Sequence, residues 1–197
     1  TPIPTVTAMS VPAAHVDDTL LDRCVGGDIF AFRELYEQWK TPLYSLAYRF
    51  HGNREDAEDT LQDAFVSMYR GIGSFRRDAQ FSSWMYRILM NACISSTRPK
   101  RSTERSMDFQ DEHTHPHNPG AGGDVLLRDI LEEEIAGLPD LQKAVFILYA
   151  EKGMTHGEIA DVLRISTGTS KSSYHRARTR LKERLAQRGI HDIEVEA

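Results

Sequence analysis

The chain contains few of the residues that mark several large classes of protein. Its 197 residues include only two cysteines, Cys24 and Cys93, which are too few and too far apart for a disulfide framework or a CxxC metal site. No run approaches the roughly 18 apolar residues that a membrane span needs, and the N-terminus lacks the basic and apolar segments of a secretory signal. We therefore expect a cytoplasmic protein without membrane insertion. Cys24 and Cys93 are expected as small apolar residues on helix faces, with a redox pair as the alternative.

Motifs of enzyme active sites are also missing. The sequence has no G-x-x-x-x-G-K-[ST], no G-x-S-x-G and no H-E-x-x-H, so we predict neither catalysis nor a cofactor. His113, His115 and His117 alternate along an extended stretch and could share one metal ion. No cysteine completes that set, and the surrounding Pro/Gly-rich residues offer no rigid support. We therefore expect the segment around these histidines to be polar and solvated, without a metal ion.

Charge is unevenly distributed along the sequence. The formal net charge of −5 argues against a protein that coats nucleic acid indiscriminately. Against this acidic background the stretch from Arg164 to Arg188 is strongly basic. It is therefore a candidate for a local binding patch.

Helical periodicity runs through the chain without a convincing period-two segment, which predicts an all-α protein. We expect two small helical bundles, at residues 17–98 and 124–188, joined by a flexible linker at 99–123 that is rich in Pro, Gly, His and acidic residues. Residues 1–16 are expected as a flexible tail in which Met9 is a candidate start, and residues 189–197 as a second tail. In the first bundle, Thr41-Pro42 predicts the start of a new helix by N-cap logic.

Residues 154–178 read as a DNA-binding helix-turn-helix. Thr155 and Glu158 form a T-x-x-E capping box that starts a first helix, and Thr167 is the candidate N-cap of a second. On the second helix four apolar residues recur at helical spacing and can be buried: Tyr174, Ala177, Leu181 and Leu185. The opposite face, with Ser172, His175, Arg176 and Thr179, would then be free to enter a DNA groove.

The chemistry of this helix suits DNA. Lys171, Arg178 and Lys182 could reach phosphates, while Arg176 could pair with a guanine edge and Ser172 with several bases. The alternative is a basic, solvated helix. The order of a capped helix, a turn and a basic helix favours DNA binding.

The first bundle carries two further candidate surfaces. Aromatic and cationic side chains that could hold single-stranded DNA follow one another at Phe75, Arg76, Arg77, Phe81, Trp84, Arg87 and Asn91. Phe81 and Trp84 have burial in the core as their alternative. A separate acidic helix face, which suits a basic protein partner, consists of Asp56, Asp59, Gln62 and Asp63 with Phe65 beside them; its alternative is an ordinary solvated face.

These segments together resemble one protein family. Residues 53–65, Ser74-Phe75-Arg76 and residues 81–91 resemble region 2 of extracytoplasmic-function (ECF, group IV) sigma factors of bacterial RNA polymerase, in the sigma-70 family. Residues 138–185, which include Gly168-Thr169 and Lys171-Ser172, resemble region 4 of that family. The resemblance covers both predicted bundles in the family's order.

The resemblance implies a promoter-specificity subunit of the polymerase. Region 2 would dock on the clamp helices of the β′ subunit through the acidic face, and its loop and following helix would capture and melt the −10 element. Region 4 would contact the β flap and read duplex DNA of the −35 element through Thr169, Lys171, Ser172, His175, Arg176 and Arg178. An anti-sigma factor is the expected regulator.

Two positions depart from the family's pattern. Members often carry an apolar residue after Gly-Thr and a basic one after Lys-Ser, where this chain has Ser170 and Ser173. One cation fewer predicts weaker upstream binding with a shallower salt dependence. The alternatives to the sigma-factor interpretation are a conventional helix-turn-helix regulator that acts without polymerase, and a helical interaction protein or metal-responsive adaptor organised around His113–His117.

Overall fold

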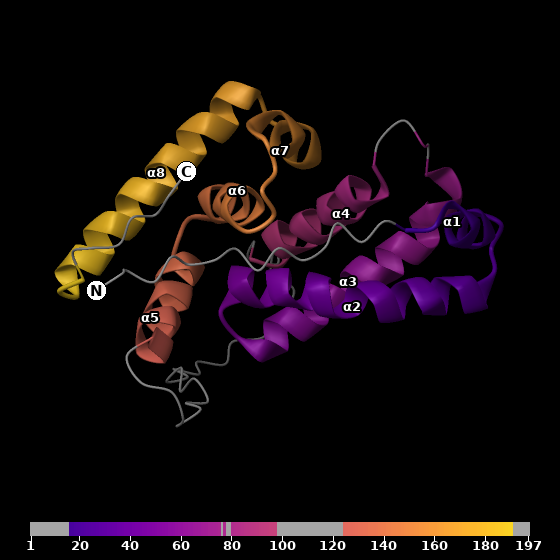
Figure 1. Cartoon of the computed structure of the whole chain (residues 1–197), viewed down its shortest axis with the longest axis horizontal. Coiled ribbons are helices and arrows are strands. Elements are labelled where there is room, and N and C mark those ends of the chain that lie inside the picture. The colour runs from indigo at the N-terminus through magenta and orange to yellow at the C-terminus, as the bar shows by residue number, and fades with distance from the viewer. Residues whose placement is uncertain (1–15, 76, 78–79, 98–123, 191–197) are drawn as a thin grey trace, which may run out of the picture.

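The computed structural model describes residues 16–75, 77, 80–97 and 124–190. All regular structure in these residues is helical, which confirms the all-α prediction. The first part comprises α1 (Asp18–Val25), α2 (Ile29–His51), α3 (Arg54–Gly71), the 3-10 turn η1 (Ile72–Ser74) and α4 (Phe81–Ser96). The second part comprises α5 (Asp124–Ala136), α6 (Asp140–Ala150), α7 (His156–Leu163) and α8 (Thr167–Gln187). Two bundles are visible in Figure 1, and the predicted linker, residues 99–123, lies outside the described residues.

The prediction of a helix start at Thr41-Pro42 was wrong, because α2 runs without a break from Ile29 to His51 with Pro42 inside it. Proline removes one backbone hydrogen bond from a helix interior. Here Trp39, Leu43 and Leu46 on the same face are all at most 1% exposed. Burial of this continuous apolar face outweighs the local penalty, and the helix ends only at Gly52, whose φ of 75° is left-handed.

The caps of the second bundle follow the sequence closely, with one correction. Thr155 and Glu158 form the predicted capping box, in which the Glu158 carboxylate accepts from the Thr155 backbone N–H at 2.8 Å. Thr167 is not the N-cap of α8 but its first helical residue. Ser166 takes the cap, and its Oγ accepts from the Thr169 N–H at 2.9 Å. Both residues are good caps, so sequence alone could not place the boundary to one residue.

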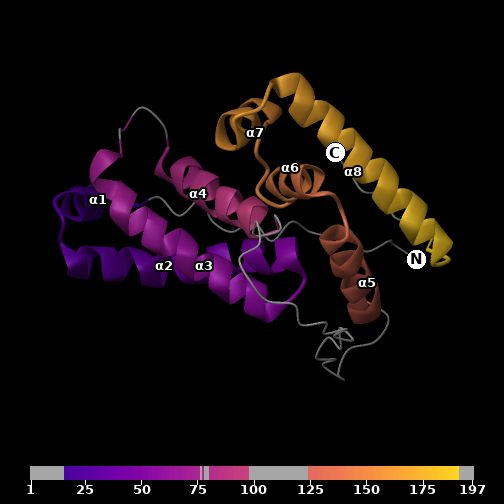
Figure 2. The same ribbon diagram turned by 180° about the vertical axis from the view of Figure 1, so that it is seen from behind.

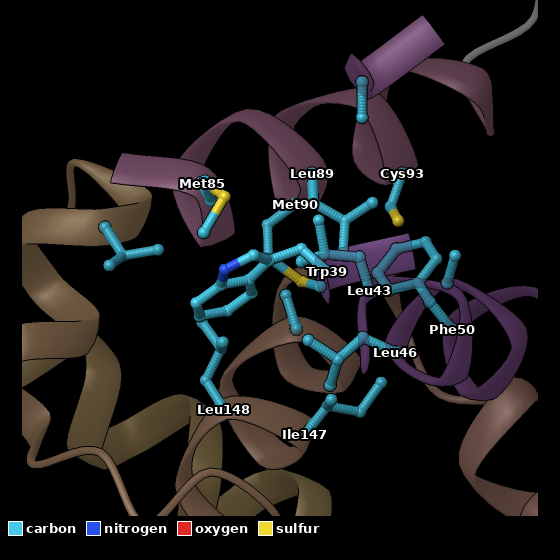
Figure 3. Packing of buried hydrophobic residues seen from close by; sticks show 14 of the residues in the cluster. Trp39, Leu43, Leu46, Phe50, Met85, Leu89, Met90, Cys93, Ile147 and Leu148 are labelled. Carbon is cyan, nitrogen blue, oxygen red and sulfur yellow. The ribbon is translucent and has the colours of Figure 1, made fainter. Parts of the chain in front are cut away.

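The two bundles share one hydrophobic core, which the sequence did not predict. Figure 3 shows Trp39 and Leu46 of α2 beside Ile147 and Leu148 of α6, with Met85, Met90 and other residues of α4 above them. Figure 2 shows the same arrangement from behind, with α6 and α7 against α4. We call this contact the shared core. The helix-turn-helix therefore rests directly on the first bundle.

Polar groups cross the boundary between the bundles as well. Arg49 Nη1 lies 3.1 Å from Glu151 Oε1, and the Thr97 hydroxyl donates to Asp140 Oδ2 at 2.6 Å. The Lys143 ammonium is buried 4.6 Å from the centre of the Phe50 ring, and burial lowers the pKa of Lys143. Burying these charges offsets part of the gain from apolar contact. The boundary between the bundles thus combines apolar burial with paired polar groups.

Both cysteines are free and buried, as expected of small apolar residues. Cys24 is on α1 and Cys93 is on α4. Burial raises the pKa of the Cys93 thiol to about 12, so its reactive thiolate form is scarce at neutral pH.

His51 makes the stability of the first bundle pH-dependent. Its Nε2 lies 2.9 Å from the Thr60 hydroxyl, and burial, assisted by Lys143, lowers the pKa of His51 from its ordinary value of 6.5. Below about pH 6.5, His51 is protonated in the unfolded chain but stays neutral in the folded chain until the pH is lower. We expect the free energy of unfolding by urea to fall between about pH 7.5 and 5.5.

The variant His51→Gln keeps a hydrogen-bonding group near Thr60 but cannot titrate. It should show a smaller fall in unfolding free energy over the same pH range than the native chain. Some dependence should persist, because burial also lowers the pKa of His156. An unchanged pH dependence in His51→Gln would show that His51 is not responsible.

Candidate nucleic-acid interface

Helix α8 presents the basic face that the sequence predicted. Tyr174, Ala177, Leu181 and Leu185 are buried, as expected from their spacing. The side chains left exposed on the other side include Lys171, Ser172, His175, Arg176 and Arg178. In Figure 1, α8 lies at the outer edge of the molecule, away from α1, α2 and α3. Among the described residues, the basic face is therefore exposed along α8.

Two of the predicted contact residues already make local hydrogen bonds. Thr169 is half-buried, and its hydroxyl lies 2.8 Å from Ser166 Oγ in the helix cap. The Ser172 hydroxyl donates to the Thr169 carbonyl at 3.1 Å but stays exposed. Thr169 is thus part of the cap that starts α8, while Ser172 can exchange its bond for one to DNA.

The two serines that depart from the family's pattern both point inward. Ser170 is fully buried and Ser173 is 6% exposed. Neither contributes to the basic face. The predicted weakening of upstream binding through Ser173 stays a prediction.

Aromatic residues at the start of α4 form a cluster with the loop before it. The ring of Phe75 lies 5.1 Å from Phe81 and 5.5 Å from Trp84, and the rings of Phe81 and Trp84 are stacked at 5.3 Å. Phe81 and Trp84 are 8% and 9% exposed, so for these two the alternative of burial holds in this conformation. Phe75 is half-buried rather than a free loop residue. Base stacking on this cluster would require the loop to move.

The cations of the same region differ in their surroundings. Arg77 is exposed and paired with α1 through the carboxylates of Asp22 and Asp18, the latter at 3.7 Å. Arg87 is half-buried and Asn91 is exposed on α4. Arg76 lies outside the described residues. Arg77 and Asp22 are 55 residues apart in the sequence, so their pairing could not be predicted from a local sequence pattern.

The acidic face of α3 is largely as predicted. Asp56, Asp59, Gln62 and Asp63 are all exposed. Asp56 also helps to start the helix, because the Asn53 side-chain amide donates to its carboxylate at 2.8 Å. These side chains form an open, negatively charged surface.

Phe65 was wrongly included in that surface. It is only 6% exposed and packs with its ring 4.7 Å from Tyr36, in an edge-to-face contact. The exposed apolar side chains beside the acidic face are instead Tyr36, Val66 and Tyr69. Val66 and Tyr69 follow Gln62 by four and seven residues. Helical spacing could therefore have identified them.

Other ligand sites find little support in the described part of the chain. No group of three or more His, Cys, Asp or Glu residues there could hold a metal ion. His113, His115 and His117 lie outside it. None of its helices is both long enough and apolar enough to cross a bilayer.

Comparison with known proteins matches both halves of the chain. The family model of sigma-70 region 2 matches residues 35–103, and that of sigma-70 region 4 matches residues 128–181. The chain is 35% identical to the ECF RNA polymerase sigma factor SigM of Mycobacterium tuberculosis, over 86% of this chain and 84% of that protein. It is 32% identical to the ECF RNA polymerase sigma factor SigW of Bacillus subtilis, over 81% of this chain and 91% of that protein.

Solved structures share the fold. CnrH, in complex with the cytosolic domain of CnrY, superposes with a TM-score of 0.62 at 23% identity, over 86% of this chain and 96% of that chain. The sigma factor RpoE of Bartonella quintana, crystallised with the anti-sigma factor NepR, gives a TM-score of 0.60 at 23% identity, over 79% of this chain and 96% of that chain.

The ion pair between Arg77 and Asp22 should compete with DNA phosphate for the guanidinium. We expect Asp22→Asn to bind a single-stranded oligonucleotide about two- to fivefold more tightly, because an exposed ion pair contributes little and is readily exchanged. Fluorescence anisotropy with a labelled oligonucleotide would measure the change. In an Arg77→Ala background the same substitution should give a smaller gain; an equal gain would mean that only overall charge matters.

Proposed function

The chain belongs to the ECF sigma factors of the sigma-70 family, and we propose that it programs core RNA polymerase to start transcription at promoters with a −35 and a −10 element. It is an RNA polymerase sigma factor, so its partners include the polymerase, and an anti-sigma factor is the expected regulator. The single observation that carries the proposal is the pairing of region 2 and region 4 in one chain, with the basic face of α8 exposed. We expect the protein to act by binding and positioning, without catalysis of its own.

Region 4 would read the −35 element through α8. The exposed side chains of Lys171, His175 and Arg176 lie on one side of the helix, opposite its buried face. An α-helix fits the DNA major groove, where an arginine can donate two hydrogen bonds to guanine. Arg176 is our candidate for that base contact, with Ser172 and His175 beside it. Lys171 and Arg178 would hold phosphates, and Thr169 would support them from the helix cap.

Region 2 would capture the −10 element. Arg77, Arg87 and Asn91 offer charge and hydrogen bonds on the loop and on α4, and Arg76 adds a further cation in the sequence. The aromatic cluster of Phe75, Phe81 and Trp84 could receive an unstacked base once the loop moves, since stacking on aromatic rings is worth about 1–3 kcal/mol per base. Such capture would hold the strands apart and favour melting.

The surface of α3 would dock on the polymerase. Asp59, Gln62 and Asp63 provide charge that complements a basic partner such as the β′ clamp helices. Tyr36, Val66 and Tyr69 lie exposed next to them and could supply apolar contact. An interface with a central apolar patch and a charged rim is the usual arrangement in protein complexes.

The packing of the two bundles holds their candidate DNA-binding surfaces at one fixed separation. α4 lies directly against α7 of the helix-turn-helix (Figure 1). Two elements that are one to two turns of DNA apart are separated by about 35–70 Å. The 25 residues at 99–123 could span about 80 Å when extended. We therefore propose that the shared core opens when the protein binds polymerase.

In vitro transcription tests the proposed function. Core RNA polymerase with this protein should produce defined new start sites on a library of genomic fragments. Arg176→Ala should lower transcription from those sites about tenfold, the effect expected from losing one bidentate base contact. The exposed Arg128 on α5 pairs with Glu132 in its own helix, so Arg128→Ala serves as the matched control and should leave transcription unchanged.

Failure to associate with core polymerase, together with binding to duplex DNA, would contradict the sigma-factor proposal. A conventional helix-turn-helix regulator would then be the better assignment.

The proposed opening can be tested by locking the bundles together. The side chains of Thr97 and Asp140 meet at 2.6 Å across the boundary, so Thr97→Cys with Asp140→Cys should allow a disulfide. The native Cys24 and Cys93 are buried and should not interfere. The oxidised double variant should support no transcription, and reduction should restore it. Each single variant under the same oxidation is the control, and full activity of the oxidised form would refute opening.

A further inference from the structure

Ser170 is a buried polar residue in α8 that the DNA-binding face does not explain. It is completely buried, four residues into the recognition helix, at a position where members of the family often carry an apolar residue. A buried hydroxyl without a partner is unfavourable by roughly 1–3 kcal/mol. The partner here is His156, whose Nδ1 lies 2.9 Å from Ser170 Oγ. The hydroxyl thus links α8 to the first residue of α7.

His156 is itself held in place from a third helix. Its ring stacks on Tyr149 of α6 with centroids 4.6 Å apart and planes inclined by 20°. Tyr149 in turn lies 4.4 Å from the ring of Tyr174 on α8. Burial, with Lys171 nearby, lowers the pKa of His156, so the neutral ring is the dominant form at neutral pH. The imidazole is therefore fixed in orientation on a packed support.

The hydrogen bond between Ser170 and His156 lies near the start of α8, where a small movement of the helix would displace the side chains proposed to contact bases. Lys171 and Ser172 directly follow Ser170 and point outward. Farther along α8, Leu181 and Leu185 are buried and anchor the other end of the helix. With a rise of 1.5 Å per residue, a tilt of about 3° around that end would move the outward side chains near Ser170 by about 1 Å. A base-specific hydrogen bond does not survive a displacement much larger than this.

The turn before α8 does not fix this angle by itself. Arg164 closes α7 in the left-handed conformation, with φ of 54° and ψ of 48°. That conformation is unfavourable for a residue with a side chain and sets the corner only at one end of α7. The bond between His156 and Ser170 ties the opposite end of α7 to α8. Two separated points of attachment define an angle between helices better than one.

We propose that His156 and Ser170 are a positioning pair that sets the angle of the recognition helix and thereby the sequence preference at the −35 element. The inference rests on the proposed function, and neither residue needs to touch DNA for it. In family members with an apolar residue at the position of Ser170, packing alone would have to set this angle. The pair would then adapt the common fold to a preference of this chain's own.

The test is selection of DNA by the full chain in complex with core RNA polymerase. The library would carry a constant −10 element and a randomised −35 element, and the native protein and Ser170→Ala would be compared. Ser170→Ala removes one oxygen and leaves the side-chain volume nearly unchanged. We expect it to bind the native −35 sequence about three- to tenfold more weakly, because the outward side chains of α8 would no longer be held at one angle, and to select a broader or shifted −35 sequence.

Ser173→Ala is the matched control, because it removes a buried hydroxyl from the same helix and leaves the hydrogen bond between Ser170 and His156 in place. It should select the native sequence. His156→Ala should reproduce the altered selection of Ser170→Ala, and His156→Asn, whose amide can reach the position of Nδ1, should restore the native one. A purely structural role would lower affinity for all sequences alike and leave the selected sequence unchanged.

The outcomes separate the two proposals. If the native complex selects no upstream sequence, the proposed function fails and the positioning role fails with it. If the native complex selects a sequence and Ser170→Ala selects the same one with equal discrimination, the positioning role alone is overturned.

Discussion

The contact between α2, α4 and α6 is the interaction on which the rest of the structure depends. Each bundle alone is small, and small bundles bury a limited fraction of their apolar surface. The shared core adds burial for both, with Trp39 at 1% exposure beside Leu148 at 0%. It fixes where the helix-turn-helix sits, keeps α8 at the outer edge and places α4 behind α7. The relative placement of the two proposed DNA-binding surfaces therefore follows from this one contact.

Local sequence signals predicted most of the helices. They failed where contacts between residues far apart in the sequence determined the structure. The capping box at Thr155 and the buried stripe of α8 were read correctly, because each depends on residues within a few turns. Pro42 was read as a helix start, yet the apolar face that overrides it is buried partly by helices far along the chain. Phe65 was predicted beside the acidic face of α3. It is buried instead against Tyr36, which lies on another helix. Neither contact has a local signature.

The same division holds for the candidate interface. Exposure of Lys171, His175 and Arg176 follows from helical periodicity and could be predicted. The pairing of Arg77 with Asp22 joins residues 55 apart, and that of His156 with Ser170 joins residues 14 apart across a turn. Such contacts depend on how helices meet, which composition and period do not specify. The sequence marked Ser170 as unusual, and only the structure supplied its partner.

The buried polar groups in and around the shared core bear on how the two bundles could separate. Apolar burial holds the bundles together, but Lys143 is buried 4.6 Å from the centre of the Phe50 ring, and Trp39 Nε1 and Gln142 Oε1 are buried without a hydrogen-bond partner. Groups of this kind lower the net stability of a contact. A partner that offers better contacts to the two bundles separately can then separate them. This imperfect polar pairing supports the proposed opening of the shared core when the protein binds polymerase.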